Sequence, residues 1–275
     1  MSQPSSSIIM YYLRKIFVAG LIIIAIVWIA TPFAISILYS FSSTEDYYNF
    51  RLVIPLTYTF EHVKALLDLG AGEYIMNSII VALMTIGISF LLGLPAGYAF
   101  AKYIFPGKDP LKLFIVGLRM FPILVIAVPL VTLYIKLGLN DTLLGVALAH
   151  TAMALPFVVL ITSSIFAGIP KDIEEAGLIF GLSRVGVFFR ITLPMALPGL
   201  AAAAIFTFIM SWNEVFIASV LTFQHRTLPA FILTAAQASP DTIKFAAGFI
   251  MILPAMIFVF IARKYLVAMW GITLR

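Results

Sequence analysis

The stretch EEAGLIFGLSRVGVFFRITLP, residues 174–194, stands between long apolar runs and carries two carboxylates, two arginines and three glycines. The chain around it is 63% hydrophobic and only 11% charged, with a mean hydropathy of +1.11. A soluble domain carries about 25% charged residues. Because so few charges cannot cover a water-exposed surface, most of this chain must face lipid or other apolar helices.

Six apolar runs are long enough to cross the hydrocarbon core of a bilayer, which takes about 20 residues. They are 16–40, 76–101, 113–135, 143–166, 199–221 and 245–266. The sequence therefore predicts an all-α polytopic membrane protein with six transmembrane helices. The first run is longer than the apolar part of a signal peptide, which is about 7–15 residues, so we expect it to be retained.

These runs divide the chain into consecutive parts. We expect an N-terminal tail over 1–15, a first span over 16–40, an external loop over 41–75, a core of five spans over 76–266 that contains the loop 167–198, and a C-terminal tail over 267–275.

The positive charges predict the orientation, because lysine and arginine are commoner in cytoplasmic loops than in external ones. With the N-terminus inside, only five of the 17 lysines and arginines fall outside: Arg51, Lys64, Lys136, Arg226 and Lys244. Both termini and the loop 167–198 are therefore expected in the cytoplasm. The net charge of +5 follows this pattern and does not indicate a nucleic-acid partner.

Several classes of site are excluded by composition. The chain has no cysteine, and therefore no cysteine-based metal site, and no GxxxxGK[ST] phosphate loop, so we expect no ATP binding by this chain alone. No cluster of carboxylates, histidines or lysines is placed for catalysis, and we expect no enzyme and no catalytic residue.

The polar stretch predicts a short helix over 172–180. Asp172 is placed to cap it, and Glu174 and Glu175 fall in the first turn, where carboxylates suit the positive end of a helix. Gly181 stands where a glycine ends a helix, and Ser183 is placed to cap a second one.

One face of this helix is apolar with small residues at its centre: Ile173, Ala176, Gly177 and Phe180. Such a face lets another surface approach closely, and the neighbouring carboxylates favour a protein partner with arginines in a groove. The alternative is an amphipathic helix that rests on lipid headgroups. Acidic side chains disfavour that alternative, because the cytoplasmic leaflet is itself anionic.

The stretch also resembles the EAA loop of ABC-importer permeases, E-A-A, three residues, G, nine residues, I-x-L-P. The residues on that spacing are Glu175, Ala176, Gly177, Gly181, Ile191, Leu193 and Pro194. Gly177 replaces the second alanine, and Phe180 stands where the family usually has an aspartate. The resemblance implies a coupling helix that docks in a groove of a cytoplasmic ATPase. It implies that Glu174 and Glu175 pair with basic groups there, and that Ile173, Ala176 and Phe180 sit in the groove.

Four further stretches, 77–108, 120–142, 155–177 and 211–221, are similar to carbohydrate-uptake permeases in the second-permease position of maltose-type systems. That resemblance implies a prokaryotic inner-membrane permease for a sugar or polyol. It implies a second homologous permease, two ATPase copies that bind ATP and Mg, and an external solute-binding protein. The alternatives are an importer of a polyamine, amino acid or phosphate ester, or an ion-coupled secondary carrier.

Glu214 is the acidic residue deep in a predicted span, and such groups often mark a pathway. With Trp212 and Asn213 it offers an aromatic face and hydrogen-bonding groups that suit a polyol. A structural hydrogen bond to a neighbouring helix is the equal alternative.

Three further polar residues lie in or near the spans. His150 is a candidate for the same cavity as Glu214, although a lone histidine is more often simply packed and hydrogen-bonded. Asn77 is a second candidate for the pathway or a helix cap. Arg119 is expected to extend to the cytoplasmic interface, since the residues after it are uncharged as far as Ile135.

Overall fold

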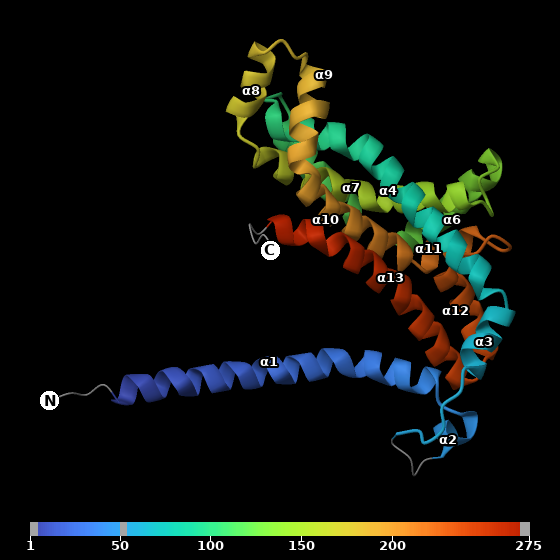
Figure 1. Cartoon of the computed structure of the whole chain (residues 1–275). Coiled ribbons are helices and arrows are strands. Elements are labelled where there is room, and N and C mark those ends of the chain that lie inside the picture. Colours follow the sequence, from blue (N-terminus) through green and yellow to red (C-terminus); the bar gives the residue numbers. More distant parts are fainter. Residues whose placement is uncertain (1–4, 50–53, 270–275) are drawn as a thin grey trace. The chain divides into compact units, whose positions relative to one another are not determined.

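The computed structural model describes residues 5–49 and 54–269, and the side chains of 10–49, 54–234 and 239–261. Every regular element in these ranges is a helix (Figure 1). Five of the described helices are long and apolar enough to cross a membrane, and a bent pair makes a sixth if it is one span. The all-helical membrane class is confirmed, whereas the count of six depends on the bent pair.

The chain separates into two compact units, Met1–Leu69 with Ser239–Ile250, and Gly70–Ala238 with Met251–Arg275. The last helix, α13 (Asp241–Met269), contributes to both. Parts of both predicted tails, 1–4 and 270–275, lie outside the described residues, as do 50–53 of the predicted external loop.

The first unit begins with α1 (Ser5–Ser40), whose most apolar stretch is entirely unburied in the chain alone. After it come α2 (Thr44–Tyr48) and α3 (Glu61–Asp68). The carboxylate of Asp46 on α2 accepts the hydroxyl and amide of Thr57 and the amide of Leu56. The Thr57 hydroxyl and amide hold the pKa of Asp46 below its usual value and fix the segment before α3 against α2.

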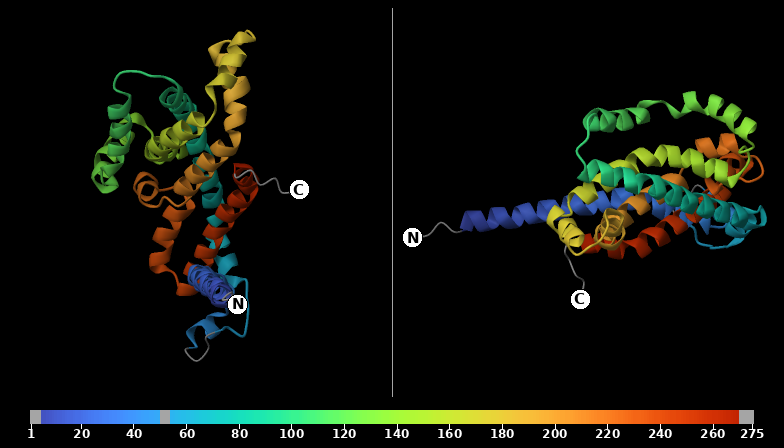
Figure 2. Two further views of the ribbon diagram at one scale, coloured as in Figure 1. Left: turned by 90° about the vertical axis from the view of Figure 1, so that its left-hand side faces the viewer. Right: turned by 90° about the horizontal axis from the view of Figure 1, so that it is seen from above.

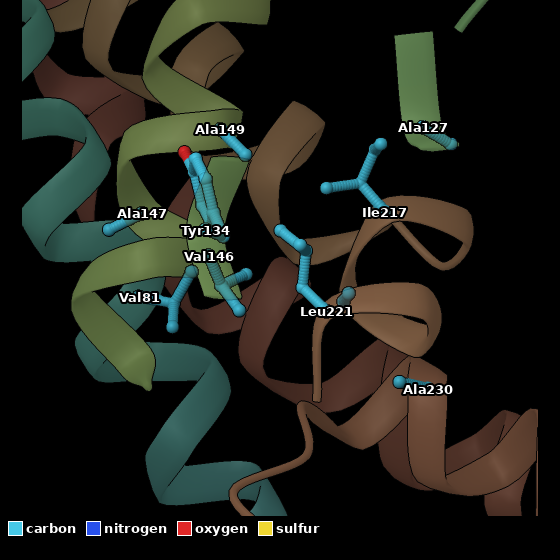
Figure 3. Close-up of a cluster of buried hydrophobic side chains, with 10 residues drawn as sticks. Val81, Ala127, Tyr134, Val146, Ala147, Ala149, Ile217, Leu221 and Ala230 are labelled. Carbon is cyan, nitrogen blue, oxygen red and sulfur yellow. The ribbon is translucent and has the colours of Figure 1, made fainter. Parts of the chain in front are cut away.

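The second unit is built on α4 (Ala71–Lys102), α7 (Leu143–Ala167) and α10 (Leu193–Trp212), with α4 and α7 packed along most of their length. Small residues and threonines allow this close approach: the Thr162 hydroxyl lies 3.3 Å from the Gly93 carbonyl. The contacts advance in the same direction on both helices, from Thr85 with Ala147 to Lys102 with Ile169, so α4 and α7 are parallel. Figure 3 shows the buried cluster at one end of this pair.

The predicted span 113–135 is not one straight helix. The chain forms α5 (Lys108–Gly117), the short η1 (Leu118–Met120) and α6 (Ile123–Leu137), and the two parts meet at 89°. The break falls at Phe121 and Pro122, because a residue before proline is disfavoured in helical conformation. Phe121 is extended accordingly, with φ −69° and ψ 124°.

The predicted span 199–221 was placed too far along the chain. The helical stretch runs through α9 (Arg184–Val187), the π-helical η2 (Phe188–Thr192) and α10, and it ends at Trp212. A new helix, α11 (Phe216–Leu221), begins after Val215, and α12 (Leu228–Ala238) follows.

Candidate functional site

Two regions of the second unit contain the candidate residues. The first is the loop formed by α8 (Lys171–Ile179) and α9, which lie together at one end of the unit (Figures 1 and 2). The second is a group of buried polar side chains between α4, α7 and the end of α10.

The end of α8 is a Schellman turn. Gly181 has φ +88° and donates to the Leu178 carbonyl, while Leu182 donates to the Gly177 carbonyl. Ser183 then accepts the Gly186 amide and caps α9, so the predicted stop and second cap are confirmed. The predicted Asp172 cap is wrong: α8 begins two residues after Ile169, with Pro170 at the capping position and no side-chain cap.

Glu174 points into the protein and is not available to a partner. It is 8% exposed, and its Oε1 lies 3.2 Å from Lys102 Nζ and 2.8 Å from the Thr192 hydroxyl. The Tyr98 hydroxyl donates to Oε2 at 3.4 Å. The expectation that both glutamates reach outward is therefore corrected: a buried carboxylate needs a partner, and Glu174 has one within its own chain.

Gly177 is also turned inward, which corrects the predicted apolar face. A Cβ at this position would lie 2.5 Å from Ile191 Cδ1 and 3.2 Å from Val187 Cγ2. The small residue therefore lets α8 approach η2 and α9 of the same chain. Ala176 is half-buried beside it.

Three apolar residues of the loop are strongly exposed to solvent. Ile179 is 84% and Phe180 is 88% exposed, and Val185 on α9 is 66% exposed. We call these three residues the apolar tip. Glu175 is exposed as well and lines a pocket of about 230 Å³ that also includes Lys102.

Three other residues of the loop differ in burial. Ile173 is 38% exposed. At the far end of the motif, Leu193 packs against the cluster around Phe166, and Pro194 is exposed.

Inside the unit, His150 and Glu214 are in direct contact. His150 is fully buried; its Nε2 lies 3.1 Å from Glu214 Oε2 and its Nδ1 lies 2.8 Å from the Ser211 hydroxyl. Ser211 continues to Thr85 at 3.5 Å. The sequence grouped His150 with Glu214, and the structure brings them together across α7 and the end of α10.

Glu214 also starts α11. Its two carboxylate oxygens accept the amides of Ile217 and Ala218, at 2.9 and 3.0 Å. These donors have no partner within a helix of their own, so the carboxylate caps the helix. Because its carboxylate already binds His150 and two backbone amides of its own chain, Glu214 fits the structural alternative rather than an open pathway.

The other pathway candidates are separate from this pair. Trp212 is fully buried, stacks on Phe208 and donates to the Met251 carbonyl at 2.9 Å, because a buried indole needs an acceptor. Asn77 is 7% exposed and donates to the Arg226 carbonyl. Asn213 is exposed and donates to the Ile209 carbonyl, one turn back. Each of these three side chains is therefore hydrogen-bonded to a backbone carbonyl of its own chain, and their role in a pathway stays a prediction.

Asp141, two residues before the start of α7, binds the segment that follows α11. It has φ +57°, a conformation that aspartate tolerates, and its Oδ1 accepts the amides of Phe223, Gln224 and His225. Burial raises the pKa of Asp141, but these three amides outweigh it and keep the pKa below its usual value.

Sequence reasoning missed the internal partners of Glu174, namely Lys102, Tyr98 and Thr192. Lys102 was counted only as a positive charge near the cytoplasm. The only sequence signal was a lysine at the end of one span and a carboxylate just after another. This signal is weak, because many lysine–carboxylate pairs are possible until the positions of the helices are known.

Three comparisons extend this description. Residues 89–269 match the family described as "Binding-protein-dependent transport system inner membrane component". The chain is 35% identical over 224 residues to the trehalose transport system permease protein of Mycobacterium tuberculosis, covering 78% of this chain and 81% of that relative. It is 34% identical over 196 residues to the diacetylchitobiose uptake system permease protein of Streptomyces coelicolor, covering 71% of this chain and 65% of that relative.

The fold is shared with a solved structure of a bacterial ABC transporter involved in the import of the acidic polysaccharide alginate. The TM-score is 0.75, with 97% of this chain and 100% of that chain covered. At 20% sequence identity, this likeness concerns the fold alone.

Proposed function

Since the chain belongs to the family of binding-protein-dependent transport system inner membrane components, the permeases of ABC importers, we propose that it forms half of a translocation path for a sugar or polyol. A second homologous permease supplies the other half. Two copies of a separate ATPase bind ATP and Mg, and this chain has no catalytic role. An external solute-binding protein delivers the substrate.

The proposed arrangement has six spans, with both termini in the cytoplasm. It counts α5 to α6 as one bent span, in addition to the five long helices. The C-terminal ends of the parallel helices α4 and α7 meet where Lys102 contacts Ile169, next to α8. The α8–α9 loop therefore lies beside a positively charged residue, Lys102, at this end of the pair. The positive-inside rule then favours the cytoplasm for this side.

The observation that carries the proposal is the apolar tip of the α8–α9 loop. Ile179, Phe180 and Val185 are exposed together with the carboxylate of Glu175, on a loop held from behind by Glu174 and Gly177. An exposed apolar group on a firmly held element favours a protein partner. We propose that α8 is the coupling helix and that the tip fills a groove of the ATPase. Closure of the ATPase pair would then move the loop and the attached helices as a rigid body.

The saccharide assignment is supported by the relatives. Besides those for trehalose and diacetylchitobiose, the alpha-glucoside transport system permease protein of Rhizobium meliloti is 31% identical to this chain over 231 residues. Proteins with similar sequences over most of their length often share a substrate class, and we infer the same class here.

The docking proposal is tested with Glu175→Arg and Phe180→Asp in the complex reconstituted with its partner permease, ATPase and binding protein. Both side chains are exposed, so we expect normal insertion and assembly of the two permeases. Binding-protein-stimulated ATP hydrolysis should be abolished, because the tip loses its charge match or its apolar group. Glu73→Arg, at the opposite end of α4 and also exposed, is the control and should leave hydrolysis unchanged. Unchanged binding-protein-stimulated ATP hydrolysis in both test variants would contradict the docking proposal.

A further inference from the structure

The described residues include an apolar cavity of about 360 Å³ lined by η1, α6, α7 and the start of α11. Its walls are formed mainly by aliphatic and aromatic side chains, among them Phe121, Ile126, Leu130 and Met153. Two groups on its wall can donate hydrogen bonds: the guanidinium of Arg119 and the hydroxyl of Tyr134. This composition, apolar walls with a few polar groups, is that of a small-molecule site.

Arg119 contacts α7 well before the end of that helix. Its guanidinium carbon is 3.3 Å from the centre of the Phe157 ring on α7. Phe157 precedes the last residue of α7, Ala167, by ten residues, which corresponds to about 15 Å along the helix. The hydrocarbon core is about 30 Å thick, so the charge lies near the middle of the span. The sequence predicts that Arg119 extends to the cytoplasmic interface, whereas in the structure η1 packs against α7 and the guanidinium meets Phe157, ten residues before the end of that helix.

No carboxylate pairs with Arg119 within the part of the chain that the structure describes. Its contact is the face of Phe157, and the guanidinium is exposed in the chain alone. A cation at this depth is costly in lipid, so it faces a protein interior or a water-filled cavity. Its five donors therefore point towards space that water, a solute or a partner must fill.

Tyr134 on α6 supplies the second donor. The residue is 6% exposed, its hydroxyl has no hydrogen-bond partner among the described residues, and it lines the same cavity as Arg119. In Figure 3 the hydroxyl is turned towards the side of the cluster where Ala149, another cavity residue, lies. The hydroxyl is not among the sealed, unpartnered polar atoms of the described chain, so it opens onto the cavity and is free to donate to a bound molecule.

We infer that Arg119 and Tyr134 form a subsite of the translocation path that donates hydrogen bonds to the oxygens of the transported saccharide, either hydroxyl or carboxylate. The flat guanidinium binds two neighbouring oxygens at once, and the apolar wall around Phe121 packs against a sugar ring. This inference rests on the proposed function, because it takes the cavity to be part of the solute path. Because sequence reasoning placed Arg119 at the interface, it predicted no cation at this depth and no such subsite.

The first experiment asks whether Arg119 faces water. Because the chain has no cysteine, Arg119→Cys can be labelled selectively with a charged trimethylammonium methanethiosulfonate, and the product on this chain identified by mass spectrometry. In the complete complex in nanodiscs we expect labelling of Arg119→Cys. Phe223→Cys, in an exposed loop, is the positive control, and Leu113→Cys on α5, outside the cavity, should react poorly. If Phe223→Cys reacts and Arg119→Cys does not, the position is closed off by lipid or by the second permease and the inference is overturned.

The second experiment measures transport. Proteoliposomes containing the complex and its binding protein are tested for uptake of trehalose and of digalacturonate, a neutral and a carboxylated disaccharide. Arg119→Gln should lower uptake of the transported one at least about tenfold, the loss expected for one charge-assisted hydrogen bond. Compared with Arg119→Gln, Arg119→Lys restores the positive charge but not the flat guanidinium. It should therefore restore more uptake if the solute carries a carboxylate than if the solute is neutral. Lys112→Gln is the matched control, since Lys112 makes a similar contact with the Phe100 ring but lies outside the cavity.

The results separate the subsite from the proposed function. A wild-type complex that takes up neither disaccharide, and whose ATP hydrolysis responds to no member of a panel of saccharides and polyols, contradicts the proposed function. The labelling result still decides whether Arg119 lines a water-filled path. Normal uptake by Arg119→Gln overturns the inference, because Arg119 then has no role with the solute. The same holds if Arg119→Gln lowers the yield of assembled complex while uptake per complex stays normal.

Discussion

Lys102 at the end of α4 and Glu174 on α8 form a buried ion pair, with Nζ and Oε1 separated by 3.2 Å and the two side chains 6% and 11% exposed. The same ammonium donates to the Ile169 carbonyl at 2.7 Å, just before α8. One lysine therefore connects α8 to the adjacent C-terminal ends of α4 and α7. Movement of α8 must carry these helices with it, unless the pair is broken.

Lys102→Met should destabilise the second unit, because it leaves the Glu174 carboxylate buried without its counter-charge. Breaking such a pair typically costs about 3–5 kcal/mol. Thermal unfolding of the purified chain in detergent measures this cost, and ATP hydrolysis in the complex measures the coupling. The double variant Lys102→Met/Glu174→Gln should recover part of the stability, since the uncompensated charge is gone. A double variant less stable than Lys102→Met would contradict this account of the ion pair.

Gly177→Val should weaken the attachment of α8, because its side chain would overlap Ile191 and Val187. Overpacking of this kind costs about 1–3 kcal/mol. The compensating change Ile191→Ala, made together with Gly177→Val, should restore most of the unfolding temperature. The control is Ala176→Val, whose side chain is only half-buried. Valine forms helices better than glycine but less well than alanine, so helix propensity alone would penalise only Ala176→Val. A loss for Gly177→Val no larger than that for Ala176→Val would therefore contradict the close approach as its cause.

Glu214→Ala should reduce stability, because it leaves His150 without its acceptor and the amides of Ile217 and Ala218 without a cap. Each unsatisfied buried group costs about 1–3 kcal/mol. Glu214→Gln keeps an oxygen for the helix start and should lose less. The measurement is the unfolding temperature together with the yield of assembled complex. If stability and assembly are normal and only transport fails, then Glu214 belongs to the solute path after all.

Asp141→Asn should lower stability at neutral pH by about 1 kcal/mol, because three backbone amides bind a charged oxygen more strongly than a neutral one. The pKa of Asp141 is lowered in the folded chain, so its contribution is complete above the ordinary carboxylate pKa. It is lost as the pH falls through the lowered folded value. Unfolding temperatures of wild type and Asp141→Asn should therefore converge in acid, and a constant difference at all pH values would refute the assignment.

The sequence by itself determined the membrane class, the position of three spans to within a few residues, the end of the first span, and the family through its loop spacing. It also placed Gly181 and Ser183 correctly, because a helix stop and a helix cap depend on neighbouring residues only. The bend at Pro122 has a local cause as well, but its size of 89° depends on what α5 and α6 pack against.

Only the tertiary structure decided which side of each helix faces the protein. Periodicity gave Glu174 and Gly177 a place on α8, but their partners Lys102 and Ile191 are brought to them by the packing of α4 and η2. For the same reason Trp212 became a buried packing residue and Arg119 a cation near the middle of a span. The orientation of a buried polar or bulky side chain depends on the acceptor or the space that it meets. That acceptor or space is formed by segments far away in the sequence. The sequence pattern of one helix does not contain the positions of those segments.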